Sequence, residues 1–175
     1  MGRKMTSRPS WRSSLSQAYN ALGGQGTSGR VAFVGVGNVL LADDAIGVDV
    51  ARALQPHFAG CDEALVIDAG VAPENQTGPL RAFQPDLVVF IDAADLGEPA
   101  GSICWLDWRE TVGMSASTHT LPLHVLAEFL TADLGCQVAL IGIQVTSVGF
   151  ETPIGDELVS SVSEIVAGIV KIILS

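Results

Sequence analysis

Short apolar runs alternate with stretches of helical spacing along this chain, and the alternation most constrains its fold. Five runs have the length and composition of strands: residues 31–35, 64–68, 87–92, a weaker one at 102–106, and 137–144. Apolar residues three and four apart predict helices over residues 121–134 and 156–174, and a third that begins near Asp43 or Asp44 and ends before Pro56. Strands that alternate with helices in this way predict an α/β domain with a mainly parallel sheet.

The first 29 residues differ from the rest of the chain. They are basic at the start, and no acidic residue occurs before Asp43. Trp11, Leu15, Ala18 and Leu22 recur at helical spacing and predict a short amphipathic helix, which residues 23–29 follow as a glycine-rich linker. We therefore expect an N-terminal extension at 1–29 and one folded domain at 30–175.

The composition limits the partners and the compartment. The formal net charge of −10 disfavours nucleic acid, and we favour a soluble acidic surface over docking to a basic partner. The most apolar stretch, residues 159–174, is interrupted by Glu164 and Lys171, so we expect a buried helix and no membrane insertion. Cys61, Cys104 and Cys136 form no CxxC pair and are expected to be buried in a reducing, cytoplasmic setting.

Polar groups gather where three predicted strands end. A turn at residues 35–38 follows the first strand, and Asp68 and Asp92 end the second and third. In parallel sheets the functional crevice lies beyond the carboxyl ends of the strands. The three segments are therefore expected to converge on one site.

The turn after the first strand has two interpretations. Gly35 and Gly37 follow a strand and precede a helix, as in dinucleotide-binding proteins, and Asp68 also fits that pattern. However, Leu40 occupies the place of the third glycine in the fingerprint, and that glycine allows close packing of the helix on the strand. A nucleotide site is therefore the weaker interpretation.

Four ionisable residues are candidates for chemistry, each with a structural alternative. Either Asp43 or Asp44 suits a helix N-cap, but only one can cap, which leaves the other to face the crevice. Asp92 ends an apolar run, where its carboxylate needs either a cation or the backbone of the next turn. His119 precedes a predicted helix; a lone histidine is more often structural, and the nearby His124 is expected to pack or to be solvated. Two carboxylates and an imidazole together would form part of a shell for zinc, nickel or iron.

Several motifs, in order along the chain, resemble those of the nickel–iron hydrogenase maturation endopeptidases. The similarity is greatest to the branch that processes the large subunit of the formate-hydrogenlyase hydrogenase. The motifs are residues 35–47 (Gly-Val-Gly-Asn-Val-Leu-Leu-Ala-Asp-Asp-Ala-Ile-Gly), 67–70 (Ile-Asp-Ala-Gly), 73–75 (Pro-Glu-Asn), 90–95 (Phe-Ile-Asp-Ala-Ala-Asp), 118–123 (Thr-His-Thr-Leu-Pro-Leu) and 140–144 (Leu-Ile-Gly-Ile-Gln).

The resemblance implies a fold and an activity. The fold is a single three-layer α/β domain with a mainly parallel, twisted sheet of about five strands flanked by helices. The activity is removal of the C-terminal extension from a hydrogenase large-subunit precursor after nickel has been inserted. Two alternatives stay open: a metal- or nucleotide-sensing binding module or chaperone without peptidase activity, and a metal-dependent peptidase with another substrate.

The resemblance also implies the site. The metal-contacting residues of the family match Asp44, Asp92 and His119, with nickel brought by the substrate rather than stably bound. Asp44 and Asp92 are also the candidates for the catalytic base, while Asp43 and Asp68 match acidic positions for which we expect only a supporting role.

Overall fold

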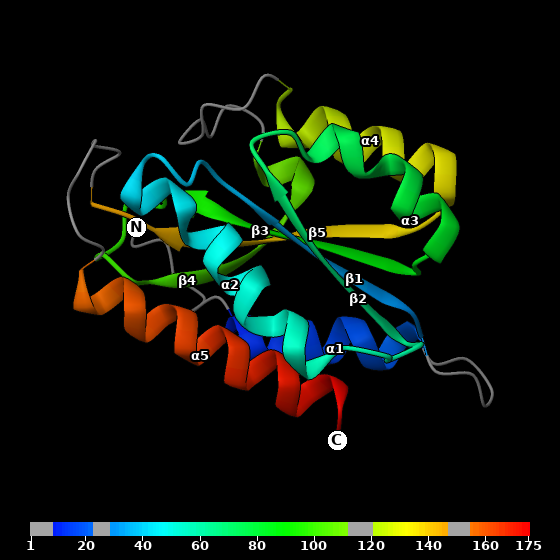
Figure 1. Cartoon of the computed structure of the whole chain (residues 1–175), viewed down its shortest axis with the longest axis horizontal. Coiled ribbons are helices and arrows are strands. Elements are labelled where there is room, and N and C mark those ends of the chain that lie inside the picture. Colours follow the sequence, from blue (N-terminus) through cyan, green and yellow to red (C-terminus); the bar gives the residue numbers. More distant parts are fainter. Residues whose placement is uncertain (1–8, 23–28, 112–120, 147–154) are drawn as a thin grey trace, which may run out of the picture.

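The computed structural model describes residues 9–22, 29–111, 121–146 and 155–175 and contains one five-stranded sheet in the order β2-β1-β3-β5-β4 (Figure 1). β1 pairs in parallel with β2 and β3, and β3 pairs in parallel with β5, whereas β4 is antiparallel to β5. The expected mainly parallel, five-stranded sheet is therefore confirmed. The strands are β1 (Val31–Val36), β2 (Ala64–Gly70), β3 (Leu87–Ala94), β4 (Ile103–Asp107) and β5 (Gln137–Gln144).

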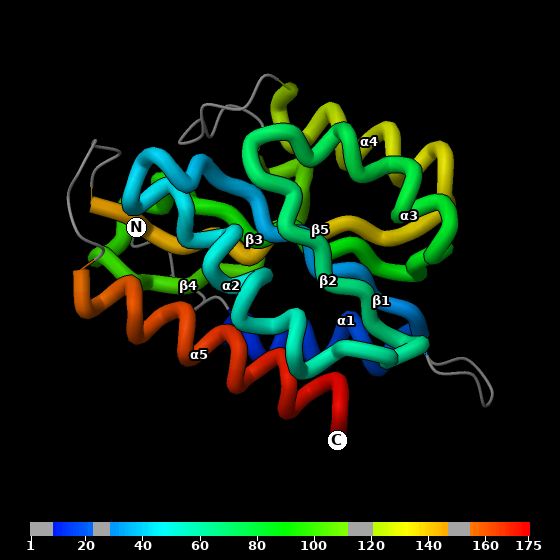
Figure 2. The backbone as a smooth tube through the Cα atoms, viewed as in Figure 1, coloured from blue at the N-terminus to red at the C-terminus, as the bar shows by residue number. Residues whose placement is uncertain are grey.

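Helices cover both faces of the sheet and complete three layers (Figure 2). One apolar core lies between the sheet and α1 (Trp11–Leu22), α2 (Ile46–Leu54) and α5 (Asp156–Ile173). A second core lies between the opposite face and α3 (Thr77–Phe83) and α4 (Leu123–Leu134). Because β1, β3 and β5 contribute to both cores, their near-continuous apolar runs are explained. The 3₁₀ helices are η1 (Ala42–Ala45), η2 (Gln55–His57), η3 (Pro73–Gln76) and η4 (Trp108–Thr111).

The elements agree with the expected ones in most places and differ at some boundaries. β5 has the predicted bounds, whereas β2 and β3 each continue two residues past the aspartate that was expected to end them. The expected elements do not include α3, whose Gly78 and Pro79 are typical of turns. The three-layer α/β fold is confirmed despite these differences.

The N-terminal helix packs on the main core. Trp11 and Leu15 are buried among residues of β1, α2 and α5, and the Trp11 indole Nε1 donates to a Glu164 carboxylate oxygen at 3.2 Å. The Trp11 ring also lies against Gly168 of α5, where an added Cβ would overlap it. The division of the chain into 1–29 and 30–175 stays a prediction, and α1 adds buried side chains to the core of the second part.

The predictions about the apolar C-terminal stretch and the cysteines have mixed outcomes. α5 packs by one face and exposes the other, so it is amphipathic rather than fully buried. No helix among the described residues is long and apolar enough to span a membrane. Cys136 is buried as expected, whereas Cys61 and Cys104 are only half-buried. Cys61 precedes the edge strand β2 and Cys104 belongs to the edge strand β4, and none of the three cysteines forms a disulfide.

Candidate functional site

The strand order reverses between β1 and β3. From β1 the chain passes through α2 to β2 on one side, and then through α3, on the opposite face, to β3 on the other side of β1. Such a switch point leaves a crevice at the carboxyl ends of the two strands. Residues just after β1 and at the end of β3 therefore lie at this crevice.

The loop after β1, cyan in Figure 1, closes on itself and fixes Asp44. The backbone N–H of Asn38 donates to the Asp44 carbonyl at 3.1 Å and to the Asp44 carboxylate Oδ2 at 3.2 Å. Gly37 has a φ of 155°, and an added Cβ would overlap the same carbonyl. Asp44 is fully buried, and the loop that it belongs to supplies a backbone donor to its carboxylate.

Neither aspartate of the Asp43-Asp44 pair is the N-cap of α2. Both lie in the 3₁₀ helix η1, and α2 begins after Ala45, which makes no side-chain cap. The capping prediction is wrong because the extra 3₁₀ turn moves the start of the α-helix past both aspartates. Burial of both side chains, at 7 % and 0 % exposure, is therefore not explained by capping.

Asp92 reaches the same place from β3. It is 3 % exposed and pairs in register with Gly142 of β5. The first turn of α2 touches the sheet beside it, because a Cβ on Gly47 would overlap the carbonyl oxygens of Ile91 and Val36. Since Gly47 follows Asp44 by three residues and Ile91 precedes Asp92, both aspartates lie at the junction of β1 and β3.

Asp68 has a different environment. Its carboxylate forms a 2.7 Å ion pair with Arg52 of α2 and accepts from the Gly70 backbone N–H at 3.2 Å. The Gly70 carbonyl in turn accepts from the backbone N–H of Gly37 at 2.9 Å, at the base of the loop that carries Asp44. Asp68 therefore supports the end of β2 and, through it, the loop. Arg52 was not among the residues singled out from the sequence; its place in α2, eight residues after Asp44, was the available signal.

The predicted third metal contact lies outside the described residues. His119 belongs to the segment 112–120, so its position relative to Asp44 and Asp92 is not part of the structure described above. Within the described ranges, no group of three or more His, Cys, Asp or Glu side chains gathers as a metal site. Of the predicted set, Asp44 and Asp92 lie at the same junction of β1 and β3. His124 is half-buried on α4.

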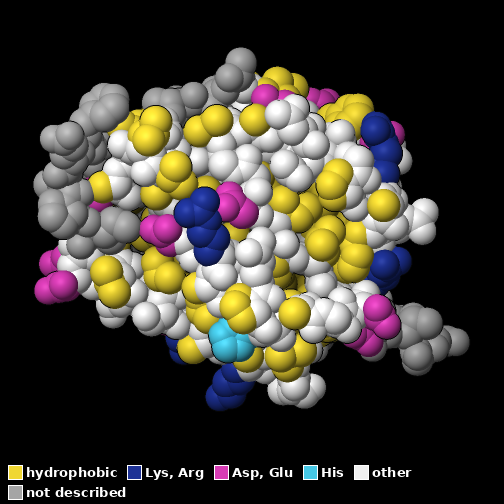
Figure 3. Space-filling model, in the orientation of Figure 1, with side chains coloured by type: hydrophobic (Ala, Val, Ile, Leu, Met, Phe, Trp, Pro, Cys, Tyr) yellow, Lys and Arg dark blue, Asp and Glu magenta, His cyan; other side chains and the backbone are white. Residues whose placement is uncertain are grey.

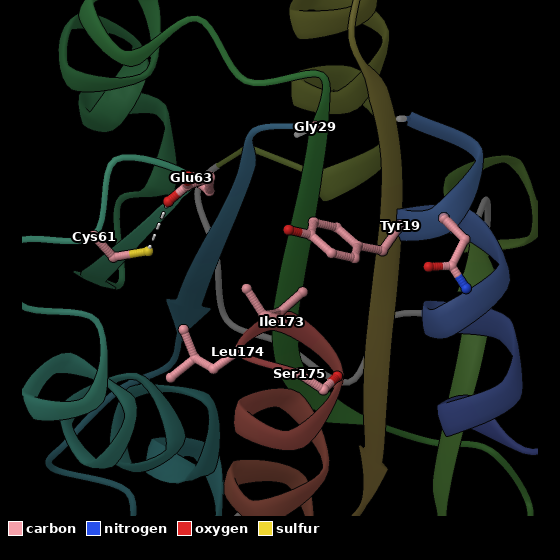
Figure 4. Close-up of a pocket in the computed structure, with 8 residues that line it drawn as sticks. Tyr19, Gly29, Cys61, Glu63, Ile173, Leu174 and Ser175 are labelled. Carbon is pink, nitrogen blue, oxygen red and sulfur yellow. Dashed lines mark hydrogen bonds between the residues drawn. The ribbon is translucent and has the colours of Figure 1, made fainter. Parts of the chain in front are cut away.

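A cavity lies at the opposite end of the strands (Figure 4). It has a volume of about 410 Å³ and is lined near the starts of β1 and β2 by Gly29, Cys61 and Glu63. The Cys61 thiol donates to the Glu63 carboxylate at 3.5 Å. Burial raises the pKa of the Tyr19 hydroxyl above its ordinary value, and the nearby Glu63 and Cys61 raise it further. This cavity is remote from the crevice that contains the aspartates.

The fold and the crevice define a class of protein. A carboxylate buried in an apolar interior costs free energy unless its environment compensates, and two at one crevice are typical of an active site. The chain is therefore an α/β protein that buries two aspartates at the switch point of its sheet, an arrangement typical of enzymes.

Comparisons with known proteins identify the family. The profile described as HycI, hydrogenase maturation protease, matches residues 48–175. The hydrogenase 3 maturation protease of Escherichia coli K12 is 33% identical over 131 residues, which cover 74% of this chain and 82% of that protein.

Solved structures agree with this result. The [NiFe] hydrogenase maturation protease HycI of Thermococcus kodakarensis has a TM-score of 0.81 and 30% identity, covering 93% of this chain and 99% of that one. The endopeptidase HycI of Escherichia coli has a TM-score of 0.69 and 31% identity, covering 79% and 87%. The chain belongs to the HycI family of hydrogenase maturation proteases, and it is an endopeptidase.

Proposed function

We propose that this endopeptidase removes the C-terminal extension of a nickel–iron hydrogenase large-subunit precursor once nickel has been inserted. The observation that supports the proposal is the burial of Asp44 and Asp92 at one junction, in a chain of the HycI family. We also propose a cytoplasmic location, for which three cysteines without a disulfide are suitable.

In this proposal nickel arrives as part of the substrate. Asp44, Asp92 and His119 are the proposed contacts, and two carboxylates with one imidazole leave coordination positions for the ligands of the precursor. A shell that is incomplete without the substrate makes productive binding depend on nickel. Binding of this kind serves as a checkpoint, since a precursor without nickel lacks the atom that these side chains contact.

The hydrolytic step needs a water molecule and a base. Water attacks the carbonyl carbon of the scissile peptide bond, the C–N bond breaks, and the proton from water ends on the leaving amine. Asp44 and Asp92 are the candidates for the base that transfers this proton. Polarisation of the carbonyl by the nickel of the substrate is the alternative source of activation.

A cleavage assay tests the proposal. The precursor, with and without nickel, is incubated with the parent enzyme and with Asp44→Asn, Asp92→Asn and His119→Ala, and its mass is measured. We expect loss of a C-terminal peptide from the nickel-loaded precursor alone, and a loss of rate of about 100-fold or more in each variant. Asp133→Asn removes a carboxylate that pairs with Arg81 on the far layer and should leave the rate unchanged.

Two results would contradict the proposal. Equal cleavage of the nickel-free precursor would show that cleavage does not depend on nickel, although the protein would still be a peptidase. Cleavage of unrelated unfolded proteins, with the precursor left intact, would indicate a peptidase of the same fold with another substrate.

A further inference from the structure

Large apolar side chains are exposed at the edge of the crevice. Leu40 is 74 % exposed and Val39 is 52 % exposed, both in the loop between β1 and η1. Val71, 47 % exposed, follows the end of β2. We call these three residues the apolar lip. Figure 3 shows hydrophobic side chains over the loop that follows β1, at the upper left of the molecule.

Hydrogen bonds to Asn38 hold the loop part of the lip in place. Leu40 N–H donates to the Asn38 side-chain oxygen at 3.0 Å, and Leu41 N–H donates to the Asn38 carbonyl at 2.9 Å. This turn directs Leu40 outward while Leu41 is buried at 7 % exposure. The same Asn38 binds the Asp44 carboxylate, so the tip of the loop and the catalytic side chain are positioned by one residue.

Val71 is tied to the same loop. β1 and β2 pair as far as Val36 and Gly70, and the Gly70 carbonyl accepts from Gly37 N–H at 2.9 Å. Val71 therefore continues from the strand end that supports the base of the loop. The lip is built from two adjacent strand ends rather than from a loose segment.

Two of the other exposed apolar residues among the described ones have different settings. Phe129 on α4 is covered in part by the Arg81 guanidinium, 5.6 Å from the ring centroid. Val159, 53 % exposed, lies alone on α5. The lip differs from these because its loop also binds the carboxylate of Asp44, a proposed catalytic residue, and because the loop from residue 36 to residue 42 contains no charged side chain.

We propose that the apolar lip binds apolar side chains of the precursor polypeptide beside the bond that is cut. This inference rests on the proposed function. An endopeptidase cuts within a chain, so polypeptide extends from the scissile bond in both directions and must cross the rim of the crevice. An uncharged, apolar rim selects apolar residues there, because exposed apolar side chains gain free energy when another apolar surface covers them.

Substitutions at the lip test the proposal through steady-state cleavage of nickel-loaded precursor. Leu40→Gln keeps the size of the side chain but not its apolar character, and we expect kcat/KM to fall about tenfold, mainly through KM. Leu40→Met should restore kcat/KM to within about twofold of the parent value. Val39→Ser should lower kcat/KM, whereas its matched control Val159→Ser, at nearly the same exposure on α5, should not.

A photocrosslink identifies what covers the lip. Benzoylphenylalanine in place of Leu40 should crosslink to a precursor peptide that flanks the cut, and the same group in place of Val159 should not. The lip proposal would be overturned by an unchanged kcat/KM in Leu40→Gln, or by a crosslink only to a second copy of this chain. In either case, cleavage of the precursor by the parent enzyme would still uphold the proposed function. If the parent enzyme leaves the precursor intact, the proposed function fails, and the lip proposal fails with it.

Discussion

Gly47 is the residue at which the backbone of α2 touches the sheet. An added Cβ would overlap two backbone oxygens, those of Val36 and Ile91, on adjacent strands. Neither strand can move aside without disturbing the centre of the sheet. We predict that Gly47→Ala lowers the free energy of unfolding by about 3 kcal/mol or more, because overpacking against backbone has no flexible side chain to relieve it.

Gly78 provides the matched control for this substitution. It lies in α3, and an added Cβ would meet no heavy atom within 4 Å. Gly78→Ala should therefore raise the free energy of unfolding by about 0.5 kcal/mol, as alanine favours helix. Urea unfolding followed by circular dichroism measures both variants. Equal stability in the two would mean that α2 does not approach the sheet as closely as described.

The three thiols differ in burial, and we expect this difference to set their reactivity. Burial raises the pKa of the Cys136 thiol above its ordinary value, and its Sγ lies 3.7 Å from the Leu130 carbonyl that accepts from it. Cys61 and Cys104 are half-buried. We predict that iodoacetamide alkylates Cys136 at least about tenfold more slowly than Cys61 in the native protein, since alkylation needs an accessible thiolate.

Peptide mass mapping after timed alkylation gives the three rates. In denaturant the rates should become similar, which shows that the fold and not the neighbouring sequence sets the order. Native alkylation of Cys136 as fast as Cys61 would contradict the buried position of Cys136 beneath α4.

Among the secondary-structure elements, those with a strong apolar pattern were the predictable ones. β5 and β1 pass through the middle of the sheet, so their sequences are apolar on both faces and their bounds follow closely from the residues. α3 escaped prediction because its seven residues contain Gly78 and Pro79. The start of α2 was misplaced because the 3₁₀ turn η1 has the same apolar spacing as the helix that follows it.

The contact between α2 and β2 has a pH dependence that can be tested. Burial raises the pKa of Asp49 above its ordinary value, and Asp68 adds to the effect, although Arg52 opposes it. An acid with a raised pKa in the folded state is ionised more easily in the unfolded chain. The cost to stability is therefore absent below the unfolded pKa of about 3.9 and appears as the pH rises through that value.

We accordingly predict that Asp49→Asn is more stable than the parent protein at about pH 7 and equal to it at about pH 3. The gain is small, because Asp49 is half-buried and the substitution also removes its attraction to Arg52. Urea midpoints at the two pH values provide the measurement. A variant less stable than the parent at neutral pH would mean that the pairing with Arg52 outweighs burial.

α1 is held to the fold mainly by Trp11. Its ring packs on Gly168, its Nε1 binds Glu164, and the side chain is 4 % exposed. We predict that Trp11→Ala lowers the free energy of unfolding by about 3 kcal/mol or more, through the cavity and the lost contact area. Gln17→Ala, an exposed change on the same helix, should have almost no effect. A small effect of Trp11→Ala would indicate that α1 undocks at little cost and belongs to a separate extension.

For the molecule as a whole, the location of the site was more predictable than its construction. Parallel strand order places the residues after β1 and at the end of β3 at one edge, which the sequence pattern already indicates. The bond from Asn38 to Asp44 depends on the conformation of one loop, and the contact of Gly47 with Ile91 depends on tertiary packing. Neither follows from the apolar pattern of the sequence. His119 lies outside the described residues, so its role stays a prediction.

The net charge of −10 and the apolar lip predict different responses of catalysis to salt. If the acidic surface attracts a basic substrate, kcat/KM should fall steeply as salt is added, because the screening length shrinks from about 30 Å at 0.01 M to about 3 Å at 1 M. If apolar contacts at the lip dominate, kcat/KM should change by less than about threefold, since salt does not weaken apolar burial. We predict the second result, and cleavage rates of nickel-loaded precursor across this range of NaCl would measure it. A tenfold fall would instead assign the acidic surface a docking role.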